Sequence, residues 1–529
     1  MADNHTQRPA SDSTTTVATE TDMEQGSSWQ KPTGELEAIE SQGNAAVSAT
    51  DLEKGPANEP DARDPNIVDW DGPDDPENPQ NWPEKKKWTN IALISGLTLV
   101  TPLGSSMFAP GIPAIMVEFK ETSSIIATFV VSVYILGFAF GPLIVAPLSE
   151  TYGRRHLYIW GNILFVIFSV GTALSQNMDM MLAFRFLMGL AGSVPITIGS
   201  GSIADMMPIE QRGRAMSAWA LGPLLGPCVG PVAGGYLIKA SSWRWVYWLT
   251  CIVGGIFIPC SFLLMRETYG PTILENRTRR LRKETGNKDL RSALTSTQPT
   301  AERWRHAIVR PLKLLILTPI VTIMALYIAV AYGILYLMIT TFSFVYRDQY
   351  GFDEGEAGLT FLPAGIGMMI GVVTFGALGD MLVKKRQASG EPLTPEIRLT
   401  PALVMPCAMV LPIGLFIYGW TTNYSVHFIV PMLGVVIFTC GLMGVMMCIQ
   451  NYLLDTIPRY AASTTAALAV LRSLAGALLP LGGLEMYNSL GLGWGNSLLG
   501  FLTLAMVPLP LIFFLFGARI RARSNLNVG

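Results

Sequence analysis

Long apolar stretches alternate with short polar connections along most of the chain. Many of these stretches reach the roughly 18–20 residues that a helix needs to cross the hydrocarbon core of a bilayer. Only 14% of the residues are charged, against roughly 25% in typical soluble domains. We therefore expect an all-α membrane protein and not a soluble enzyme. The pattern predicts twelve transmembrane helices, near residues 88–110, 124–147, 157–175, 180–203, 215–238, 245–265, 318–345, 357–379, 400–420, 427–450, 461–484 and 494–517.

The connections between these spans differ in their content of lysine and arginine, which sets the orientation of a membrane protein. Alternate connections are basic and contain residues such as Arg154, Arg212 and Lys384. The opposite connections hold few basic residues, namely Lys120, Lys239, Arg244 and Arg347. The positive-inside rule therefore places the basic connections, and with them both termini, in the cytoplasm.

The same pattern divides the chain into five parts. Residues 1–84 contain nearly half of the 39 acidic residues and few apolar ones, which predicts a disordered acidic cytoplasmic tail. Residues 85–265 and 314–518 are each expected to form a six-helix bundle, and residues 519–529 a cytoplasmic tail. The central cytoplasmic loop, 266–313, is basic; it could form a helix on the inner membrane face or remain a solvated loop.

Short sequences of the first half recur in the second half in the same order. DMMP (205–208) is echoed by DTIP (455–458), and SETYGRR (149–155) by GDMLVKKR (379–386). Duplicated halves are typical of secondary transporters, whose substrate site lies near mid-membrane between them. The sequence therefore predicts two pseudo-symmetric six-helix bundles with the site at their interface.

Two arginines lie within apolar spans, Arg185 in the fourth and Arg472 in the eleventh. A charge inside the membrane is unfavourable and is expected to face a cavity. Two arginines in one cavity would favour cargo with anionic or polar acceptor groups, unless backbone carbonyls or Glu485 neutralise them. Arg185 could instead lie near the membrane edge and extend to the surface. Aromatic or polar residues within the spans are candidates for an amphipathic pocket, or equally for bundle packing: Tyr134, Tyr327, Tyr332, Tyr336, Phe342, Phe361 and Asn451.

Three motifs carry a resemblance to a known family. APLSETYGRRHLYI (146–159) resembles the signature loop between spans two and three of the major facilitator superfamily, with Glu150 as its acid. RFLMGLAGSVP (185–195) resembles the RxxxG motif of span four. GPLLGPCVGPVAGGYL (222–237) matches the GxxxGPxxGG antiporter motif at Gly226, Gly230, Pro231, Gly234 and Gly235. Residues 74–520 thus resemble this superfamily and, within it, the fungal twelve-span drug:proton antiporters.

The resemblance implies the major facilitator fold and export of amphipathic small compounds, such as drugs, toxins or secondary metabolites, by alternating access. It implies a proton gradient as the energy source, no cofactor, a lipid bilayer environment and a monomer. It favours the plasma membrane over the vacuolar membrane. The antiporter motif would form a seam that prevents leak, or alternatively a general packing face of small residues.

The resemblance also implies roles for charged residues. Arg185 and Arg472 are expected on the substrate or proton pathway. An acid at one helix end can hold an arginine and face the N-terminus of another helix, which would form a gate on the cytoplasmic side. If the arginines only set topology, no such gate exists. The expected gate comprises Glu150, Gly153, Arg154, Arg155, Asp205, Arg212, Asp380, Lys384, Asp455 and Arg459.

Other functions are less well supported. A proton-coupled importer of a nutrient or vitamin, or a polyamine carrier, is the alternative, and a membrane sensor or scaffold is a third. No carboxylate lies clearly mid-membrane, so the sequence names no proton carrier and offers nothing to pair with a polyamine. There is no P-loop, no spacing of metal ligands and no basic patch, so nucleotide hydrolysis, metal chemistry and nucleic-acid binding are not expected.

Overall fold

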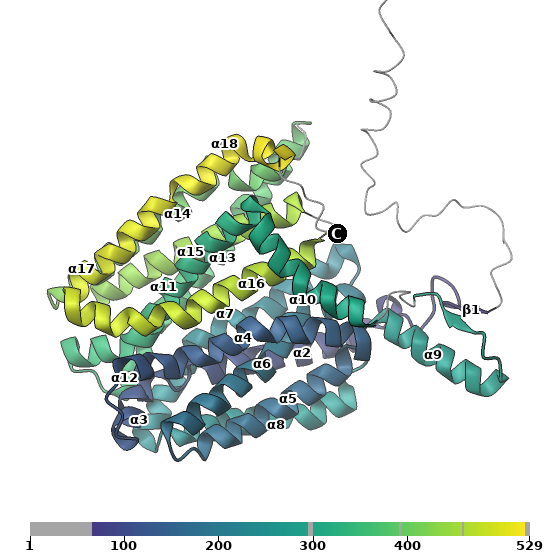
Figure 1. The fold of residues 1–529 in the computed structure, drawn as a ribbon, viewed down its shortest axis with the longest axis horizontal. Helices are drawn as coiled ribbons and strands as arrows, with labels where there is room; N and C mark the ends of the chain where they lie inside the picture. Colours follow the sequence, from purple (N-terminus) through teal and green to yellow (C-terminus); the bar gives the residue numbers. More distant parts are fainter. Residues whose placement is uncertain (1–65, 295–299, 391–393, 458–459, 524–529) are drawn as a thin grey trace, which may run out of the picture. The chain divides into compact units, whose positions relative to one another are not determined.

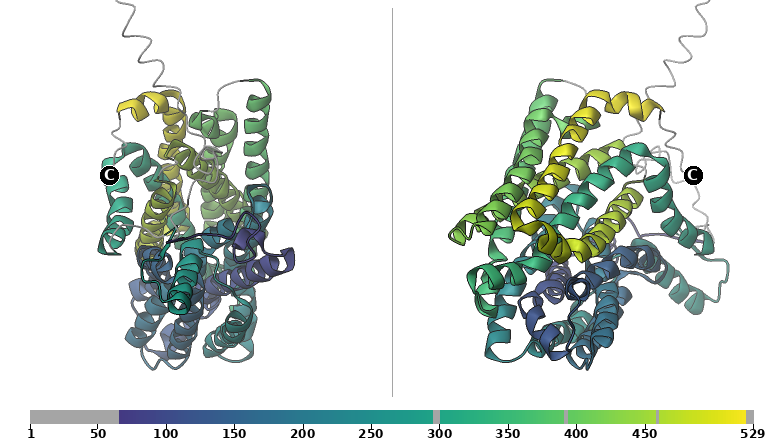
Figure 2. Two further views of the ribbon diagram at one scale, coloured as in Figure 1. Left: turned by 90° about the vertical axis from the view of Figure 1, so that its right-hand side faces the viewer. Right: turned by 60° about the vertical axis from the view of Figure 1, so that its left-hand side comes forward.

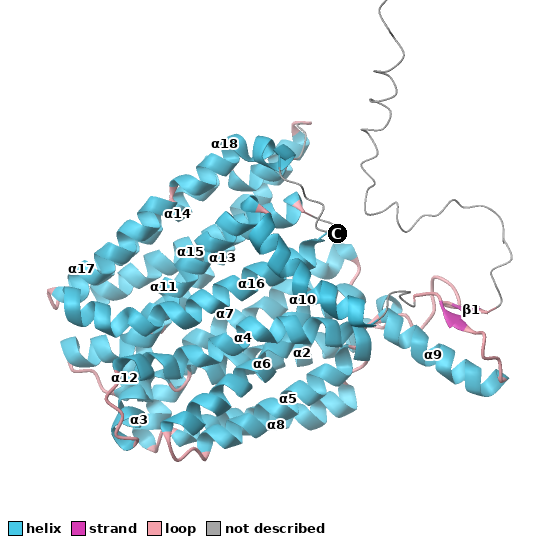
Figure 3. Ribbon diagram, in the orientation of Figure 1, coloured by secondary structure: helices cyan, strands magenta, loops and turns pink. Residues whose placement is uncertain are grey.

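The computed structural model describes residues 66–294, 300–390, 394–457 and 460–523, and these residues are mainly helical (Figures 1 and 3). They belong to one compact unit of the chain. The first bundle begins with a broken crossing, in which the 3-10 turn η2 (Ala109–Gly111) separates two helices. Its helices are α2 (Glu84–Ser106), α3 (Ile112–Glu118), α4 (Ser124–Tyr152), α5 (Arg154–Ala173), α6 (Met178–Met206), α7 (Ile209–Ala240) and α8 (Arg244–Leu264).

The second bundle has the same number of crossings, and several of them are divided into shorter helices. Its helices are α11 (Pro319–Tyr350), α12 (Glu354–Leu359), α13 (Leu362–Ala388), α14 (Pro401–Asn423), α15 (Ile429–Thr456), α16 (Ala461–Leu478), α17 (Gly483–Met506) and α18 (Pro508–Arg523). The 3-10 turns η3 (Pro395–Leu399) and η5 (Leu479–Gly482) lie before α14 and after α16.

The described helices account for twelve crossings of a membrane. Eleven stretches are long and apolar enough for a crossing, and the last, Ser463–Arg521, is 59 residues long. That stretch holds two crossings because the chain turns back at Gly491 inside α17 (Figure 1). Gly491 has a φ of +74°, which residues other than glycine rarely adopt. The predicted spans are confirmed, although several helices extend farther, as α13 does to Ala388.

The helix contacts repeat between the two bundles. In the first bundle α4 packs on α6, α2 on α7, and α5 on α8. In the second, the helices at equivalent places make the same contacts: α13 packs on α15, α11 on α16, and α14 on α17. Figure 2 shows the bundles as two groups, the first in blue and the second in green and yellow. They meet where α4 packs on α16 and where α7 packs on α12 and α13, which confirms the predicted duplicated architecture.

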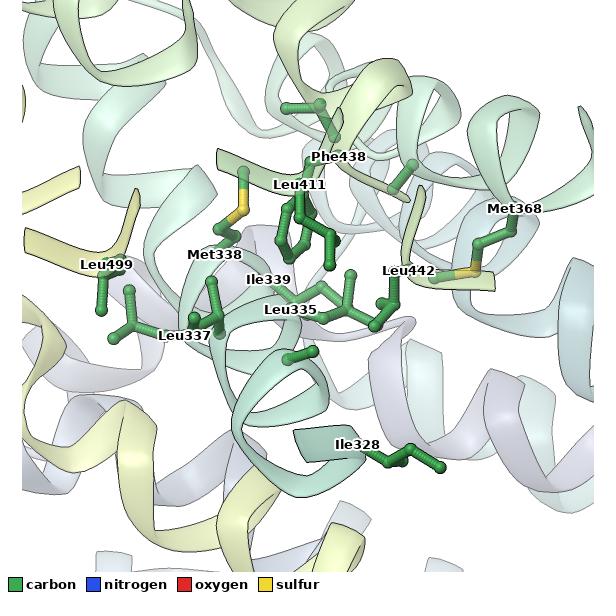
Figure 4. Packing of buried hydrophobic residues seen from close by; sticks show 14 of the residues in the cluster. Ile328, Leu335, Leu337, Met338, Ile339, Met368, Leu411, Phe438, Leu442 and Leu499 are labelled. Carbon is green, nitrogen blue, oxygen red and sulfur yellow. The ribbon is translucent and has the colours of Figure 1, made fainter. Parts of the chain in front are cut away.

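The apolar interior of the second bundle surrounds α11, because this helix is apolar on every side (Figure 4). Leu335 and Leu337 of α11 are each 2% exposed, and they pack in one cluster with Phe438 of α15 and Leu411 of α14. A helix that is hydrophobic all round is expected in such a central position. One part of α11 also reaches the interface between the bundles.

The segment before the first crossing is ordered from residue 66, which corrects the prediction of a disordered tail through residue 84. β1 (Ile67–Val68) pairs in parallel with β2 (Arg291–Ser292), and η1 (Pro79–Asn81) leads to Trp82, which is 6% exposed. Arg277, which belongs to the central part of the chain, forms an ion pair with Asp75, and the two charged groups are 2.7 Å apart. The remainder of the predicted tail, residues 1–65, lies outside the described residues.

The central connection is helical rather than a plain loop. It contains α9 (Gly270–Thr285) and α10 (Thr300–Leu317), so helices form within residues 266–313, while their position on the inner membrane face stays a prediction. The predicted boundary at 314 falls inside α10, because that helix continues to Leu317. The predicted C-terminal tail also begins later than residue 519, since α18 runs to Arg523; residues 524–529 lie outside the described part.

Candidate functional site

A cavity of about 200 Å³ lies between the two bundles. Four helices of each bundle contribute to it, namely α2, α4, α6 and α7 from the first and α11, α13, α15 and α16 from the second. Its wall is mainly apolar, with residues such as Phe138, Leu224, Leu335, Ile339, Met368, Met443 and Met446. The polar lining residues are Ser105, Tyr332, Tyr336 and Arg472. The duplicated architecture predicts a site in this place.

Arg472 is the one charged residue among those that line the cavity. Its guanidinium lies 4.8 Å from the centroid of the Tyr332 ring, and the Tyr332 and Tyr336 rings are 5.0 Å apart. The Nε atom of Arg472 is buried and has no hydrogen-bond partner within the described part of the chain. Glu485, the carboxylate that could have neutralised it, accepts a hydrogen bond from Ser124 of the first bundle. Arg472 is therefore a cation in an apolar wall.

Arg185 lies elsewhere, fully buried inside the first bundle. Its guanidinium donates hydrogen bonds to the carbonyl oxygens of Val130 (2.6 Å) and Ser105 (3.2 Å) and to the hydroxyl of Tyr247 (2.9 Å). Ser105 is in the last turn of α2, where carbonyls lack partners within the helix and the dipole favours a cation. Neither the expected cavity position nor the alternative at the membrane edge is correct; backbone carbonyls neutralise Arg185.

The aromatic candidates divide between the cavity and the packed interior. Tyr332 and Tyr336 line the cavity, whereas Tyr134 is fully buried and donates a hydrogen bond to the Thr101 carbonyl at 2.8 Å. The remaining candidates are not among the lining residues: Tyr327, Phe342, Phe361 and Asn451. Phe342 and Phe361 pack on each other with ring centroids 5.4 Å apart, which is the bundle-packing alternative.

Sequence reasoning missed the methionines of the cavity wall. Met368, Met443 and Met446 come from GMM (367–369) and MGVMM (443–447), two clusters in spans eight and ten. Methionine is unbranched and polarizable, so it adapts to ligands of different shape. The clustering of methionine in these two spans could have identified these positions.

We call the end of the bundles that holds α3 and α12 the distal end. Here the antiporter motif of α7 packs closely on both bundles. A side chain at Gly234 would overlap the Met107 carbonyl, and one at Gly235 would overlap the Glu354 carbonyl of the second bundle. Side chains at Gly226 and Gly230 would meet Pro102 and Ser106 of α2, and the Pro231 carbonyl lies against Gly358 of α12. Small residues permit this close contact. Pro231 and Gly235 form a seam with the second bundle, whereas Gly226, Gly230 and Gly234 pack within the first.

An ion pair crosses the interface beside this seam. Lys239 at the end of α7 lies 2.6 Å from Asp353, the residue that caps α12. The hydrogen bond from Lys239 holds the pKa of Asp353 below its usual range. Asp353 also forms a capping box with Glu356, which fixes the start of α12. The distal end is thus closed by backbone packing together with one charged pair.

The opposite end, which we call the basic end, contains Arg154 and Arg398. Arg154 at the start of α5 binds Asp205 at 2.6 Å. The Glu267 carboxylate accepts hydrogen bonds from the backbone N–H groups of Arg154 (2.9 Å) and Arg155 (3.0 Å), as a carboxylate at a helix N-terminus should. Glu150, the predicted acid, is exposed and forms no ion pair with any described residue. Asp205 thus holds the arginine, and Glu267 faces the N-terminus of the helix; both roles were predicted for Glu150.

The other gate residues of the first bundle have local contacts. Gly153 has a φ of +85°, and a side chain there would meet the carboxylate of Glu267. Arg155 donates to the Phe262 carbonyl at 2.8 Å, and Arg212 to the Ala204 carbonyl at 3.0 Å. These arginines stabilise helix ends within their own bundle.

The second bundle repeats the pair. Arg398 binds Asp455 at 2.9 Å and lies 3.9 Å from Asp380. Asp455 stands in DTIP where Asp205 stands in DMMP, so the duplicated acids have equivalent arginine partners. Lys384 is exposed and without an ion pair to the described residues, and Arg459 lies outside them. Among the described ion pairs, those at the basic end lie within one bundle, whereas Lys239–Asp353 joins the two.

The residues that line the cavity can bind and enclose a molecule. No carboxylate, histidine or cysteine lines the cavity. Within the described residues, no group of histidine, cysteine and acidic side chains could hold a metal ion.

Comparisons with known proteins identify relatives over most of the length. A family model described as "Major Facilitator Superfamily" matches residues 94–480. The chain is 51% identical over 469 residues to "Efflux pump radE" of Floropilus chiversii, covering 88% of this chain and 87% of that protein. It is 49% identical over 502 residues to "MFS-type transporter penM" of Penicillium rubens, covering 94% and 98%.

Solved structures share the fold at low sequence identity. The xylose transporter XylE from E. coli, in a partially occluded inward-open conformation, matches with a TM-score of 0.58 and 18% identity, covering 82% of this chain and 98% of that one. A bacterial homologue of the human lysosomal transporter Spinster matches with a TM-score of 0.58 and 13% identity, covering 85% and 100%.

Proposed function

This chain belongs to the Major Facilitator Superfamily of secondary transporters, and we propose that it exports amphipathic small organic compounds by alternating access. The observation that carries the proposal is the cavity between the bundles, with an apolar wall, two tyrosines and one arginine. Pockets of this kind bury the apolar part of a ligand and orient it through a few polar groups. Drugs, toxins and secondary metabolites fit this description.

Two observations support export as the direction. The antiporter motif packs α7 against α12 without side chains between the backbones, which would keep the distal end closed while cargo enters from the basic end. A relative that shares 51% of its residues is named an efflux pump. The basic end would face the cytoplasm by the positive-inside rule, in the plasma membrane, with the chain acting as a monomer.

The energy source in this proposal is the proton gradient, with no cofactor. Because no carboxylate lines the cavity, the proton would bind outside the cavity wall. At the basic end, the described pairs Arg154–Asp205 and Arg398–Asp455 each lie within one bundle. Separation of the bundles at this end would leave both pairs intact, so they can persist through the transport cycle. Opening of the distal end would have to break Lys239–Asp353.

The cavity disfavours a polyamine carrier. Polyamines are cations and would need acidic partners within the membrane, but the one charged lining residue is Arg472. Uptake of a nutrient or vitamin would require the same cavity with the opposite direction of net transport.

Efflux from cells that express the chain tests the proposal. A panel of fluorescent amphipathic compounds is loaded, and their loss is followed with and without a protonophore. Met446→Trp would fill the cavity, whereas Leu263→Trp alters a side chain of α8 that is 74% exposed. We expect protonophore-sensitive efflux that Met446→Trp abolishes and Leu263→Trp preserves at matched protein levels. Increased uptake, or no change for any compound, would overturn the exporter proposal.

A further inference from the structure

Arg472 differs from the other arginines of the site in having no acceptor. Arg154 and Arg398 bind carboxylates, and Arg185 binds five acceptors inside the first bundle. The described contact of Arg472 is with the face of Tyr332, while its Nε atom is buried and unpaired. An arginine stays charged at physiological pH, so this part of the cavity holds an uncompensated positive charge.

Among the described residues that line the cavity, none carries a negative charge that would compensate this charge. The other polar lining residues are Ser105, Tyr332 and Tyr336, none of which is ionised at neutral pH. Glu485 is occupied by Ser124 at the junction of α17 with α4. A cation in an apolar environment is stabilised by an anion and by hydrogen bonds to its remaining donors. A bound ligand can supply both.

The shape of the site suits an organic acid. The guanidinium is a planar fork that binds a carboxylate or a similar oxyanion through two parallel hydrogen bonds. Tyr332 covers one face of it, so the edge of the guanidinium, which includes the unpaired Nε atom, remains for the ligand. Phe138, Ile339 and Met446 line the same cavity and provide apolar contact for the rest of the molecule.

We propose that the cargo is an amphipathic organic acid, ionised at neutral pH, whose anionic group binds Arg472. This inference rests on the proposed transport function and specifies the class of its substrate. It identifies Arg472 as the residue that selects for charge, with Tyr332 as the residue that positions its guanidinium. A neutral ester of the same acid would leave the arginine without an anion and would bind more weakly.

Three dansyl compounds test the inference, because they share one fluorophore and differ in charge. Dansylglycine is an anion, its methyl ester is neutral and dansylcadaverine is a cation. Binding to the purified full-length chain in lipid nanodiscs is followed by dansyl fluorescence. We expect dansylglycine to bind most tightly. Arg472→Gln should weaken that binding by about tenfold to hundredfold, the loss expected for a hydrogen-bonded ion pair. Arg472→Lys should retain part of the affinity.

Two controls separate charge recognition from folding and from packing. Leu263→Trp alters a side chain of α8 that is 74% exposed and does not line the cavity, so it should bind dansylglycine as well as wild type. The ester should bind equally to wild type and to Arg472→Gln, which also shows that the variant is folded. Equal binding of acid and ester to wild type would overturn the inference, as would failure of dansylglycine to bind. If chloride displaces dansylglycine as effectively as organic acids do, the inference is also overturned, because the site would then recognise an inorganic anion.

Failure of this inference can be distinguished from failure of the proposed function. If neutral and cationic compounds are exported through a path that Met446→Trp blocks, without preference for acids, the chain is an exporter and the inference is wrong. If dansylglycine binds through Arg472 but no compound leaves the cell, the inference stands and the export proposal is wrong.

Discussion

Lys239 of the first bundle and Asp353 of the second form an ion pair of 2.6 Å at the distal end. Both side chains are partly open to solvent, at 54% and 36% exposure, so the pair should contribute little to stability. Its role is better described as a contact that exists in one conformation and must break in another. We expect Lys239→Ala to change the melting temperature little and to favour opening of the distal end.

The conservative variant Lys239→Arg checks that description, because it keeps the positive charge and leaves Asp353 as the cap of α12. It should retain the closed population that Lys239→Ala reduces. The measurement is the rate at which a thiol reagent labels a cysteine placed on the cavity wall, such as Ile339→Cys, in a background without other reactive cysteines. If Lys239→Ala labels no faster than Lys239→Arg and the unchanged chain, the pair does not control the distal end.

Substitution of Gly235 should impair transport far more than substitution of Lys239. A side chain at this position would overlap the Glu354 carbonyl of the second bundle, and backbone cannot move aside without separating α7 from α12. We therefore expect Gly235→Leu to reduce transport to background while the protein remains folded. Gly255→Leu on α8 is the matched control, since a Cβ there meets no atom within 4 Å. Equal transport by both variants would contradict a role for the seam.

Arg185 should matter for stability before it matters for transport. Removing its side chain leaves the Gly104 and Ser105 carbonyls at the end of α2 without their donor, and each buried acceptor left unpaired costs about 1–3 kcal/mol. We expect Arg185→Leu to lower the melting temperature in detergent by several degrees, whereas Arg472→Gln should leave it unchanged or raised. A transport defect in Arg185→Leu without loss of thermal stability would point instead to a direct role in proton or cargo binding.

The sequence predicts the crossings and the duplication well because both depend on local composition and on order along the chain. The apolar length of each span is a property of consecutive residues, and the echo of DMMP in DTIP requires no knowledge of contacts. The equivalent pairs Asp205–Arg154 and Asp455–Arg398 follow from that duplication. The location of a cavity between the halves follows as well.

The sequence predicts side-chain partners less well, because several candidates stand at similar distances along the chain. Glu150 is closest in sequence to Arg154, yet Asp205 and Glu267 bind at that helix start because the folds of α6 and α8 bring them there. Arg185 and Arg472 look alike as lone cations in apolar spans. Only the break of α2 after Ser106 explains why one meets carbonyls and the other faces a cavity.

Glu267 should be a key structural acid of the basic end. Its carboxylate accepts hydrogen bonds from the backbone N–H groups of Arg154, Arg155, Thr268 and Tyr269. We expect Glu267→Ala to lower the melting temperature, because it leaves the N-terminus of α5 uncapped, and Glu267→Gln to lower it less, since the amide oxygen still accepts. Glu150→Ala is the control and should have no effect, because Glu150 is exposed. The opposite ranking would return the role to Glu150.

The segment before α2 should remain attached to α9 at neutral pH and detach only in acid. Burial raises the pKa of Asp75, but hydrogen bonds from the backbone N–H groups of Asp71 and Glu77 and from Arg277 outweigh it and lower the pKa overall. A lowered pKa means that this stabilisation is complete above the ordinary aspartate value of 3.8 and is lost as pH falls through the folded-state pKa. The protection of residues 66–83 from hydrogen exchange, taken relative to the intrinsic exchange rate at each pH, would therefore be high and constant at neutral pH and would be lost only in strong acid. Asp75→Asn should make exchange fast even at neutral pH, whereas Asp74→Asn, at a neighbouring exposed position, should not. Fast exchange in the wild-type chain at neutral pH would mean that the contact between Arg277 and Asp75 does not hold the segment.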